Sequence, residues 1–146
     1  MSAIISSQPP IRTILLVEDE AAVREVTRHV LEIAGYLVLE ASSAEQAIAV
    51  FRRFEGAIDL LLTDVVMPSM SGTELATRLK VLRPGFVTIF MSGYSGNAGL
   101  AQADLRPPNS YIQKPFSISV LLARVAEALS IPIQSSDTAM GTRMPI

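Results

Sequence analysis

The amino-acid sequence predicts a single α/β domain built on a doubly wound, five-stranded parallel sheet with helices on both faces. Two observations support this prediction. Short, continuous apolar runs, typical of strands buried on both faces, alternate with segments whose apolar residues recur at helical spacing. In addition, the run Asp59–Pro68 carries an acid, Asp64, at the carboxyl end of its strand, where such sheets bind ligands. The alternative for Asp64 is an acid that only caps the strand.

Five strands and five helices are expected in alternation, which implies parallel pairing with right-handed crossovers. The expected strands are Ile14–Val17, Leu37–Ala41, the run that ends at Asp64, Val87–Met91 and Tyr111–Gln113. The inward-facing residues expected in the first, second, third and fifth helices are, in that order, Val23, Val26, Val30 and Ala34; Ala44, Ala47, Ile48 and Phe51; Leu75, Leu79 and Leu82; and Ile118, Leu121, Leu122, Val125 and Leu129.

Local signals mark where these helices begin and end. Ser43 and Ser71 each start a capping-box pattern, and Gly35 stands where the first helix needs a left-handed C-cap. The fourth helix, over Gly96–Leu105, is expected to be short and mobile, because each of its two glycines costs about 1 kcal/mol relative to alanine.

Length and composition set the domain organisation and exclude several functions. We expect a flexible lead-in over residues 1–11, a folded domain over 12–131 and a flexible tail over 132–146 that is too short for an output domain. The net charge is −2, so direct nucleic-acid binding is not expected, and the absence of cysteine excludes disulfides and thiolate chemistry. No signal peptide and no apolar run long enough to span a membrane are visible, so we expect a cytoplasmic protein.

Polar residues that follow four of the expected strands form the candidate site. Glu18 and Asp19, Asp64, Ser92 and Lys114 should meet, because parallel strands all end at one edge of the sheet. Three close carboxylates repel one another without a cation, and a hard divalent ion, best Mg²⁺, removes this repulsion. With Mg²⁺ and Lys114 balancing the charge, Asp64 can stay ionised as a nucleophile while Ser92 donates to a phosphoryl oxygen. This arrangement predicts phosphoryl transfer.

The motifs around these residues resemble those of response regulator receiver domains. They are Leu-Leu-Val-Glu-Asp-Glu, Asp64 with Met67-Pro68 and Gly72, Met-Ser-Gly, and Lys114-Pro115-Phe116, all in the order and spacing of that family over residues 12 to 131. The resemblance implies a flavodoxin-like sheet with strand order 2-1-3-4-5. It also implies a phosphoprotein of two-component signal transduction that accepts a phosphoryl group from a sensor histidine kinase or a histidine phosphotransfer protein.

The resemblance assigns roles to individual residues. Asp64 would be the phosphoacceptor, Lys114 and Ser92 would contact the phosphoryl group, and Ser92 and Tyr111 would form the conformational switch. The implied metal ligands are Asp19, Asp64, the backbone carbonyl of Val66 and, through water, Glu18. For Tyr111 the alternative is ordinary half-buried core, and for Glu18 it is a mere neighbour of the site. A cis bond between Lys114 and Pro115 is also implied.

The same resemblance implies how the signal leaves the domain. A downstream protein would bind the face made by the fourth helix, fifth strand and fifth helix, and a phosphorylation-dependent homodimer is compatible with that face. The chain would stand alone or be excised from a larger protein, for instance a hybrid histidine kinase. It would not be a conventional enzyme, although it would catalyse its own phosphorylation and dephosphorylation at Asp64.

Two other functions fit parts of the pattern. An aspartyl-nucleophile phosphohydrolase is the first, but Val65-Val66-Met67 follows Asp64, so the second acid that such enzymes carry two residues on is missing. A docking module that works without phosphorylation is the second. The intact set of acids, serine and lysine argues against it.

Overall fold

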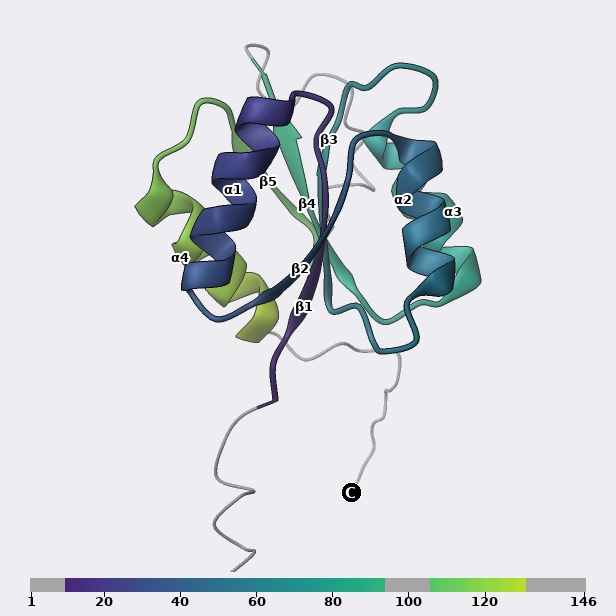
Figure 1. The fold of residues 1–146 in the computed structure, drawn as a ribbon, viewed down its shortest axis with the longest axis horizontal. Helices are drawn as coiled ribbons and strands as arrows, with labels where there is room; N and C mark the ends of the chain where they lie inside the picture. Colours follow the sequence, from purple (N-terminus) through teal and green to yellow (C-terminus); the bar gives the residue numbers. More distant parts are fainter. Residues whose placement is uncertain (1–9, 94–105, 131–146) are drawn as a thin grey trace, which may run out of the picture.

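The computed structural model describes residues 10–93 and 106–130, which form a five-stranded parallel sheet between two layers of helices (Figure 1). The strands are β1 (Thr13–Val17), β2 (Leu37–Ala41), β3 (Leu60–Asp64), β4 (Val87–Ser92) and β5 (Ser110–Gln113), in the order β2-β1-β3-β4-β5. The helices are α1 (Ala21–Ile33), α2 (Ala44–Arg53), α3 (Gly72–Leu82) and α4 (Ile118–Ser130). The predicted fold class and strand order are confirmed.

The helix boundaries follow the capping signals. The Ser43 hydroxyl accepts a hydrogen bond from the Gln46 amide at 3.1 Å, and the Ser71 hydroxyl accepts one from the Glu74 amide at 3.1 Å. Gly35 has a φ of 105°, the left-handed conformation that ends α1 at the predicted place. The predicted fourth helix, over residues 96–105, lies outside the described residues, so α4 is the helix expected as the fifth.

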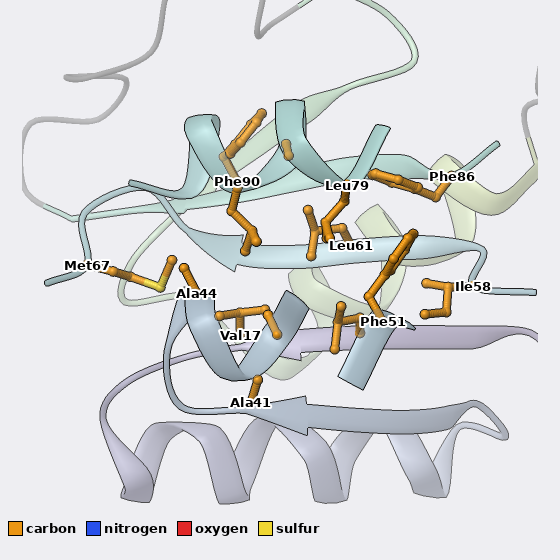
Figure 2. Close-up of a cluster of buried hydrophobic side chains, with 14 of the residues drawn as sticks. Val17, Ala41, Ala44, Phe51, Ile58, Leu61, Met67, Leu79, Phe86 and Phe90 are labelled. Carbon is orange, nitrogen blue, oxygen red and sulfur yellow. The ribbon is translucent and has the colours of Figure 1, made fainter. Parts of the chain in front are cut away.

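Apolar side chains fill both faces of the sheet. α2 and α3 cover one face, where Phe51 and Phe86 pack edge to face with ring centroids 5.8 Å apart, beside Leu61, Leu79 and Phe90 (Figure 2). α1 and α4 cover the other face. The second buried cluster lies there and contains residues of all five strands and of both helices. Because β1, β3 and β4 are buried along their whole length, their carboxyl ends are held in fixed relative positions.

Three of the predicted helix faces are partly wrong. In α3, Leu75 and Leu79 are buried as predicted, but Leu82 is 38% exposed. In α1 the buried residues are Thr27 and Leu31, whereas Val26 is 61% exposed. The predicted row (Val23, Val26 and Val30) and the observed row (Thr27 and Leu31) are neighbouring stripes on the helix surface, about 100° apart. The stripe that contains Thr27 faces the sheet. In α4, Ile118 is 57% exposed, and Ala128 is buried near the other end of the helix. None of the helices that the structure describes is long and apolar enough to cross a membrane.

Candidate functional site

The carboxyl ends of four strands meet around a cavity of about 320 Å³. β3 and β4 end in Asp64 and Ser92, and the connections after β1 and β5 add the acid pair and the lysine. The cavity is lined by Glu18, Asp19, Glu20, Asp64, Val65, Val66, Met91, Ser92, Gly93 and Lys114. The structure therefore brings together the five residues that the sequence predicted for this edge, and it places Val66 beside them.

Tyr111 lies apart from this cavity. It is half-buried on β5, in register with Phe90 of β4, and packs against the hydrophobic cluster on the α2 and α3 side of the sheet. The two residues proposed as a switch thus belong to neighbouring strands, since Ser92 is two residues beyond Phe90 on β4.

Lys114 lies between two of the acids. Its ammonium nitrogen Nζ is 2.6 Å from Glu18 Oε1 and 2.7 Å from Asp64 Oδ1. The backbone fixes the start of this side chain, because the Lys114 amide donates to the Ser92 carbonyl at 2.7 Å and the peptide bond to Pro115 is cis, as expected. The second oxygen of the buried Glu18 carboxylate accepts from the Glu20 amide at 3.1 Å. Each oxygen of the Glu18 carboxylate therefore already accepts one hydrogen bond.

Burial and proximity shift the ionisation of these groups. Burial, reinforced by Glu18, raises the pKa of Asp64 to about 8 despite the opposing effect of Lys114. Burial would also raise the pKa of Glu18, but hydrogen bonds with Asp64 and Lys114 lower it overall. Burial works to lower the Lys114 pKa, but the hydrogen bonds to the two acids raise it overall. Without a bound cation, these shifts favour a proton on Asp64 at neutral pH beside an ionised Glu18 and a charged Lys114.

The acids are close enough to share a metal ion. Glu18, Asp19 and Asp64 each offer a carboxylate oxygen, and these oxygens lie within 4.8 Å of one another. A set of oxygen ligands with three formal negative charges suits a hard divalent cation, whose charge would replace the proton on Asp64. The donor set fits a metal ion.

Tight packing fixes the backbone of Asp64. A Cβ atom placed on Gly72, the first residue of α3, would lie 1.9 Å from the Asp64 carbonyl oxygen, so only glycine fits there. The Gly72 amide donates to the Val65 carbonyl at 2.8 Å, and the Thr63 hydroxyl donates to the Asp64 carbonyl at 3.0 Å. In the sequence, Gly72 stands out only as part of a motif. The close approach that requires a glycine is visible only in three dimensions.

A second, larger hollow of about 760 Å³ adjoins the site. It is lined by Glu20, Ala22, Val23, Val26, Thr27, Gly93, Lys114, Pro115 and Phe116. Most of this lining is apolar, and the exposed Val26 of α1 belongs to it. Lys114 and Gly93 line both hollows, so a molecule seated on α1 would lie next to Asp64.

One residue that contacts the backbone of the site carries no recognisable signal in the sequence. Arg24 of α1 donates from Nη1 to the backbone carbonyl of Glu18 at 2.8 Å. An arginine in the first turns of an exposed helix is too common to stand out in a sequence. The contact depends on the path of the chain between β1 and α1.

Known proteins resemble the chain over nearly all of its described part. The family described as response regulator receiver domain matches residues 14–126. Sensor kinase CckA of Brucella abortus is 38% identical over 117 residues, which are 80% of this chain and 12% of that protein. Response regulator receiver protein CpdR of the same species is 34% identical over 118 residues, which are 81% of this chain and 97% of that protein.

Solved structures agree with these relatives. A CheY-like response regulator receiver domain protein from Methanospirillum hungatei JF-1 superposes with a TM-score of 0.72 at 33% identity, covering 83% of this chain and 95% of that one. The chain spans between 12% and 52% of the length of several longer curated relatives, which include a sensor kinase, a cyclic di-GMP phosphodiesterase and transcriptional regulators. The family match, the strand order and the cluster of acids and lysine agree, and the chain belongs to the response regulator receiver family.

Proposed function

We propose that this receiver domain takes a phosphoryl group onto Asp64 from a phosphohistidine of a sensor histidine kinase or a histidine phosphotransfer protein. The observation that carries the proposal is the position of Asp64. Its buried carboxylate ends β3, pairs with Lys114 at 2.7 Å, and lies with Glu18 and Asp19 in one set of oxygen ligands. A nucleophile, a cation for the incoming phosphate and a candidate metal site therefore coincide.

Each residue has a defined part in the transfer. An ionised Asp64 oxygen attacks phosphorus, the bond from phosphorus to the donor histidine breaks, and the imidazole leaves with the electron pair and takes a proton from water. Asp19 and Asp64, with the Val66 carbonyl and water on Glu18, are proposed to hold Mg²⁺, which when bound balances charge on the phosphoryl oxygens. Lys114 and Ser92 bind the remaining oxygens, because both line the cavity that Asp64 faces.

The larger hollow beside α1 is our candidate for the surface that receives the phosphodonor protein. Its apolar lining reaches the phosphorylation site through Lys114 and Gly93, so a helix seated there could present a histidine to Asp64. Such donors act on receivers in the cytoplasm, which is the compartment we propose for this protein.

For the output we propose a second face, formed by β5, α4 and the helix predicted over residues 96–105. On phosphorylation Ser92 would move toward the phosphoryl group and Tyr111 would follow, because the two residues lie on paired strands. Ile118 and Val120 of α4 are 57% and 43% exposed, so this face offers apolar contacts to a downstream protein or a second copy of the chain.

The alternatives lack a comparable site. A phosphohydrolase of the aspartyl-nucleophile type would need an acid where Val66 stands, and the Val66 side chain is apolar and 80% exposed. A docking module independent of phosphorylation would not need two buried acids around a lysine, an arrangement that costs desolvation energy.

The proposal is tested by incubating the protein with acetyl phosphate and MgCl₂ and following its intact mass. One phosphoryl group should be added, and chelation or Asp64→Asn should abolish the addition. Asp59→Asn is the matched control, because Asp59 precedes the same strand at its opposite end and accepts from the Thr13 amide at 2.8 Å. Modification of Asp64→Asn at the wild-type level would refute the assignment.

A further inference from the structure

Arg24 connects the turn that carries the acid pair to the neighbouring strand. Its guanidinium donates from Nη1 to the Glu18 carbonyl at 2.8 Å and from Nε to Glu40 Oε1, on β2, at 3.2 Å. The arginine side chain is only 21% exposed. Two donors of one rigid, planar group are thus used in two directions, which a lysine nitrogen on a flexible stem could not reproduce.

The carbonyl that Arg24 holds belongs to the peptide group that joins Glu18 to Asp19. On the other side of the same residue, the Glu18 amide donates to the Ala41 carbonyl at 3.1 Å. The backbone that carries both carboxylates is therefore fixed to β2 twice, once through Ala41 and once through Arg24 and Glu40. This peptide plane sets the positions of the Asp19 nitrogen and Cα, and so the point from which the Asp19 side chain leaves the chain.

Asp19 needs this support more than the other acids do. Glu18 is held by Lys114 and by the Glu20 amide, and Asp64 is held by Lys114 and by the packing of α3. Asp19 is exposed and forms none of the ion pairs found among the described residues. Its position relative to Asp64 depends on the backbone of the turn.

We infer that Arg24 is a positioning residue of the acidic site: it sets the peptide group between Glu18 and Asp19 so that the Asp19 carboxylate faces Asp64 before a cation binds. The inference rests on the proposed function, in which these carboxylates hold Mg²⁺. Groups that orient metal ligands from behind commonly change metal affinity about 10- to 100-fold when they are removed.

The charge of Arg24 and its positioning role predict opposite results. If the guanidinium acted only through its charge, its removal would reduce repulsion and tighten Mg²⁺ binding. If it positions Asp19, its removal must weaken binding. Arg28 is the matched control: one turn further along α1 it pairs with the same Glu40 at 3.2 Å and with Glu32 at 2.9 Å, and neither contact touches the Glu18 turn.

The test is a titration of the full chain with MgCl₂, followed by the NMR shifts of backbone amides at residues 18–20 and 64–66, for wild type, Arg24→Gln and Arg28→Gln. Arg24→Gln should raise the Mg²⁺ Kd about tenfold, and Arg28→Gln should change it less than about twofold. At saturating Mg²⁺, phosphorylation of Arg24→Gln by acetyl phosphate should approach the wild-type rate. Unchanged or tighter binding in Arg24→Gln, or equal weakening in Arg28→Gln, would overturn the inference.

Two further results keep the outcomes separate. If Arg24→Gln fails to fold, Arg24→Lys replaces it: the charge remains, a single nitrogen cannot occupy the positions of both Nε and Nη1, and the Kd must still rise. If wild type binds Mg²⁺ but acetyl phosphate leaves Asp64 unmodified, the proposed function fails and the Kd comparison still decides the role of Arg24. If wild type binds no Mg²⁺, the inference fails with it.

Discussion

Gly72→Ala should damage the site although it adds only a methyl group, beside the backbone of the proposed phosphoacceptor Asp64. The added Cβ would lie 1.9 Å from the Asp64 carbonyl oxygen and 3.0 Å from the carbonyl carbon. A carbon and an oxygen approach comfortably to about 3.3 Å, so one of the two backbones must move by roughly 1.4 Å. The obstructing atom is backbone, which cannot be relieved by a change of rotamer.

The expected cost follows from the surroundings. Overpacking a well-filled site costs about 1–3 kcal/mol, while alanine in place of glycine in a helix gains up to about 1 kcal/mol. The Asp64 carbonyl also accepts from the Thr63 hydroxyl at 3.0 Å, and Gly72 is tied to Val65 at 2.8 Å, so neither backbone can withdraw without losing a hydrogen bond. We therefore expect a net loss of about 2 kcal/mol in the free energy of unfolding. Because a misplacement of about 1 Å can cost about 100-fold in rate, phosphorylation by acetyl phosphate should fall by a similar factor.

Urea denaturation measures the first effect, as a lower midpoint with an unchanged m-value, and mass spectrometry of acetyl phosphate reactions measures the second. Gly93→Ala is the control: Gly93 lines the same cavity next to Ser92, and no described atom lies within 4 Å of an added Cβ. If Gly72→Ala matches Gly93→Ala in stability and in phosphorylation rate, the close packing against Asp64 does not constrain the site.

Three other perturbations test the electrostatics. The pKa of Asp64 is raised from 3.8 to about 8, so the stability that its protonated form adds is present below pH 4 and is lost toward pH 8. Without metal, the free energy of unfolding should therefore fall by a few kcal/mol between these pH values. Urea melts in EDTA should show this fall for wild type and no such fall for Asp64→Asn. Asp19→Asn should lose most of the Mg²⁺-dependent rise in Tm. In wild type this rise corresponds to a stabilisation of about 2.7 kcal/mol at a hundredfold excess of Mg²⁺ over Kd. If Asp19→Asn shows the full rise in calorimetric scans, Asp19 is not a metal ligand. Lys114→Met should destabilise the metal-free protein by about 3 kcal/mol in urea melts, because it leaves the buried, ionised Glu18 without its cation. A neutral result would show that solvent replaces this ion pair.

The place of the site could be predicted from the sequence because it depends on few assumptions. Once five parallel strands are assigned, topology alone brings the ends of β1, β3, β4 and β5 to one edge, and the residues there are read directly from the chain. An error of one residue in a strand boundary, as for β1, β4 and β5, leaves this result unchanged.

Details that depend on the rotation of an element could not be predicted in the same way. On α1 the row with Val26 and the row with Thr27 and Leu31 differ by one residue, and apolar content alone favours the wrong row. The contact between Arg24 and the Glu18 carbonyl depends on that rotation and also on Glu40 of another strand. A contact that joins three residues from three separate segments of the chain leaves no periodic pattern in the sequence.

The ionisation of Asp64 links the proposed metal requirement to the proposed role of this residue as nucleophile. Without a bound metal ion, Lys114 is the positive charge that lies between Glu18 and Asp64. The raised pKa of Asp64 then favours a proton on this carboxyl group, which leaves Glu18 as the only one of the two that is ionised. A protonated carboxyl is a poor nucleophile, so Asp64 becomes reactive only when another positive charge takes the place of that proton. High pH cannot substitute for this charge. It would ionise Asp64 beside an ionised Glu18 with one ammonium group for both, and the incoming phosphoryl group would add further negative charge to the same cavity. Burial and Glu18 thus favour the protonated, unreactive form of Asp64 in the metal-free state, against the effect of Lys114. We therefore expect phosphorylation to depend on a divalent cation even at a pH that ionises Asp64.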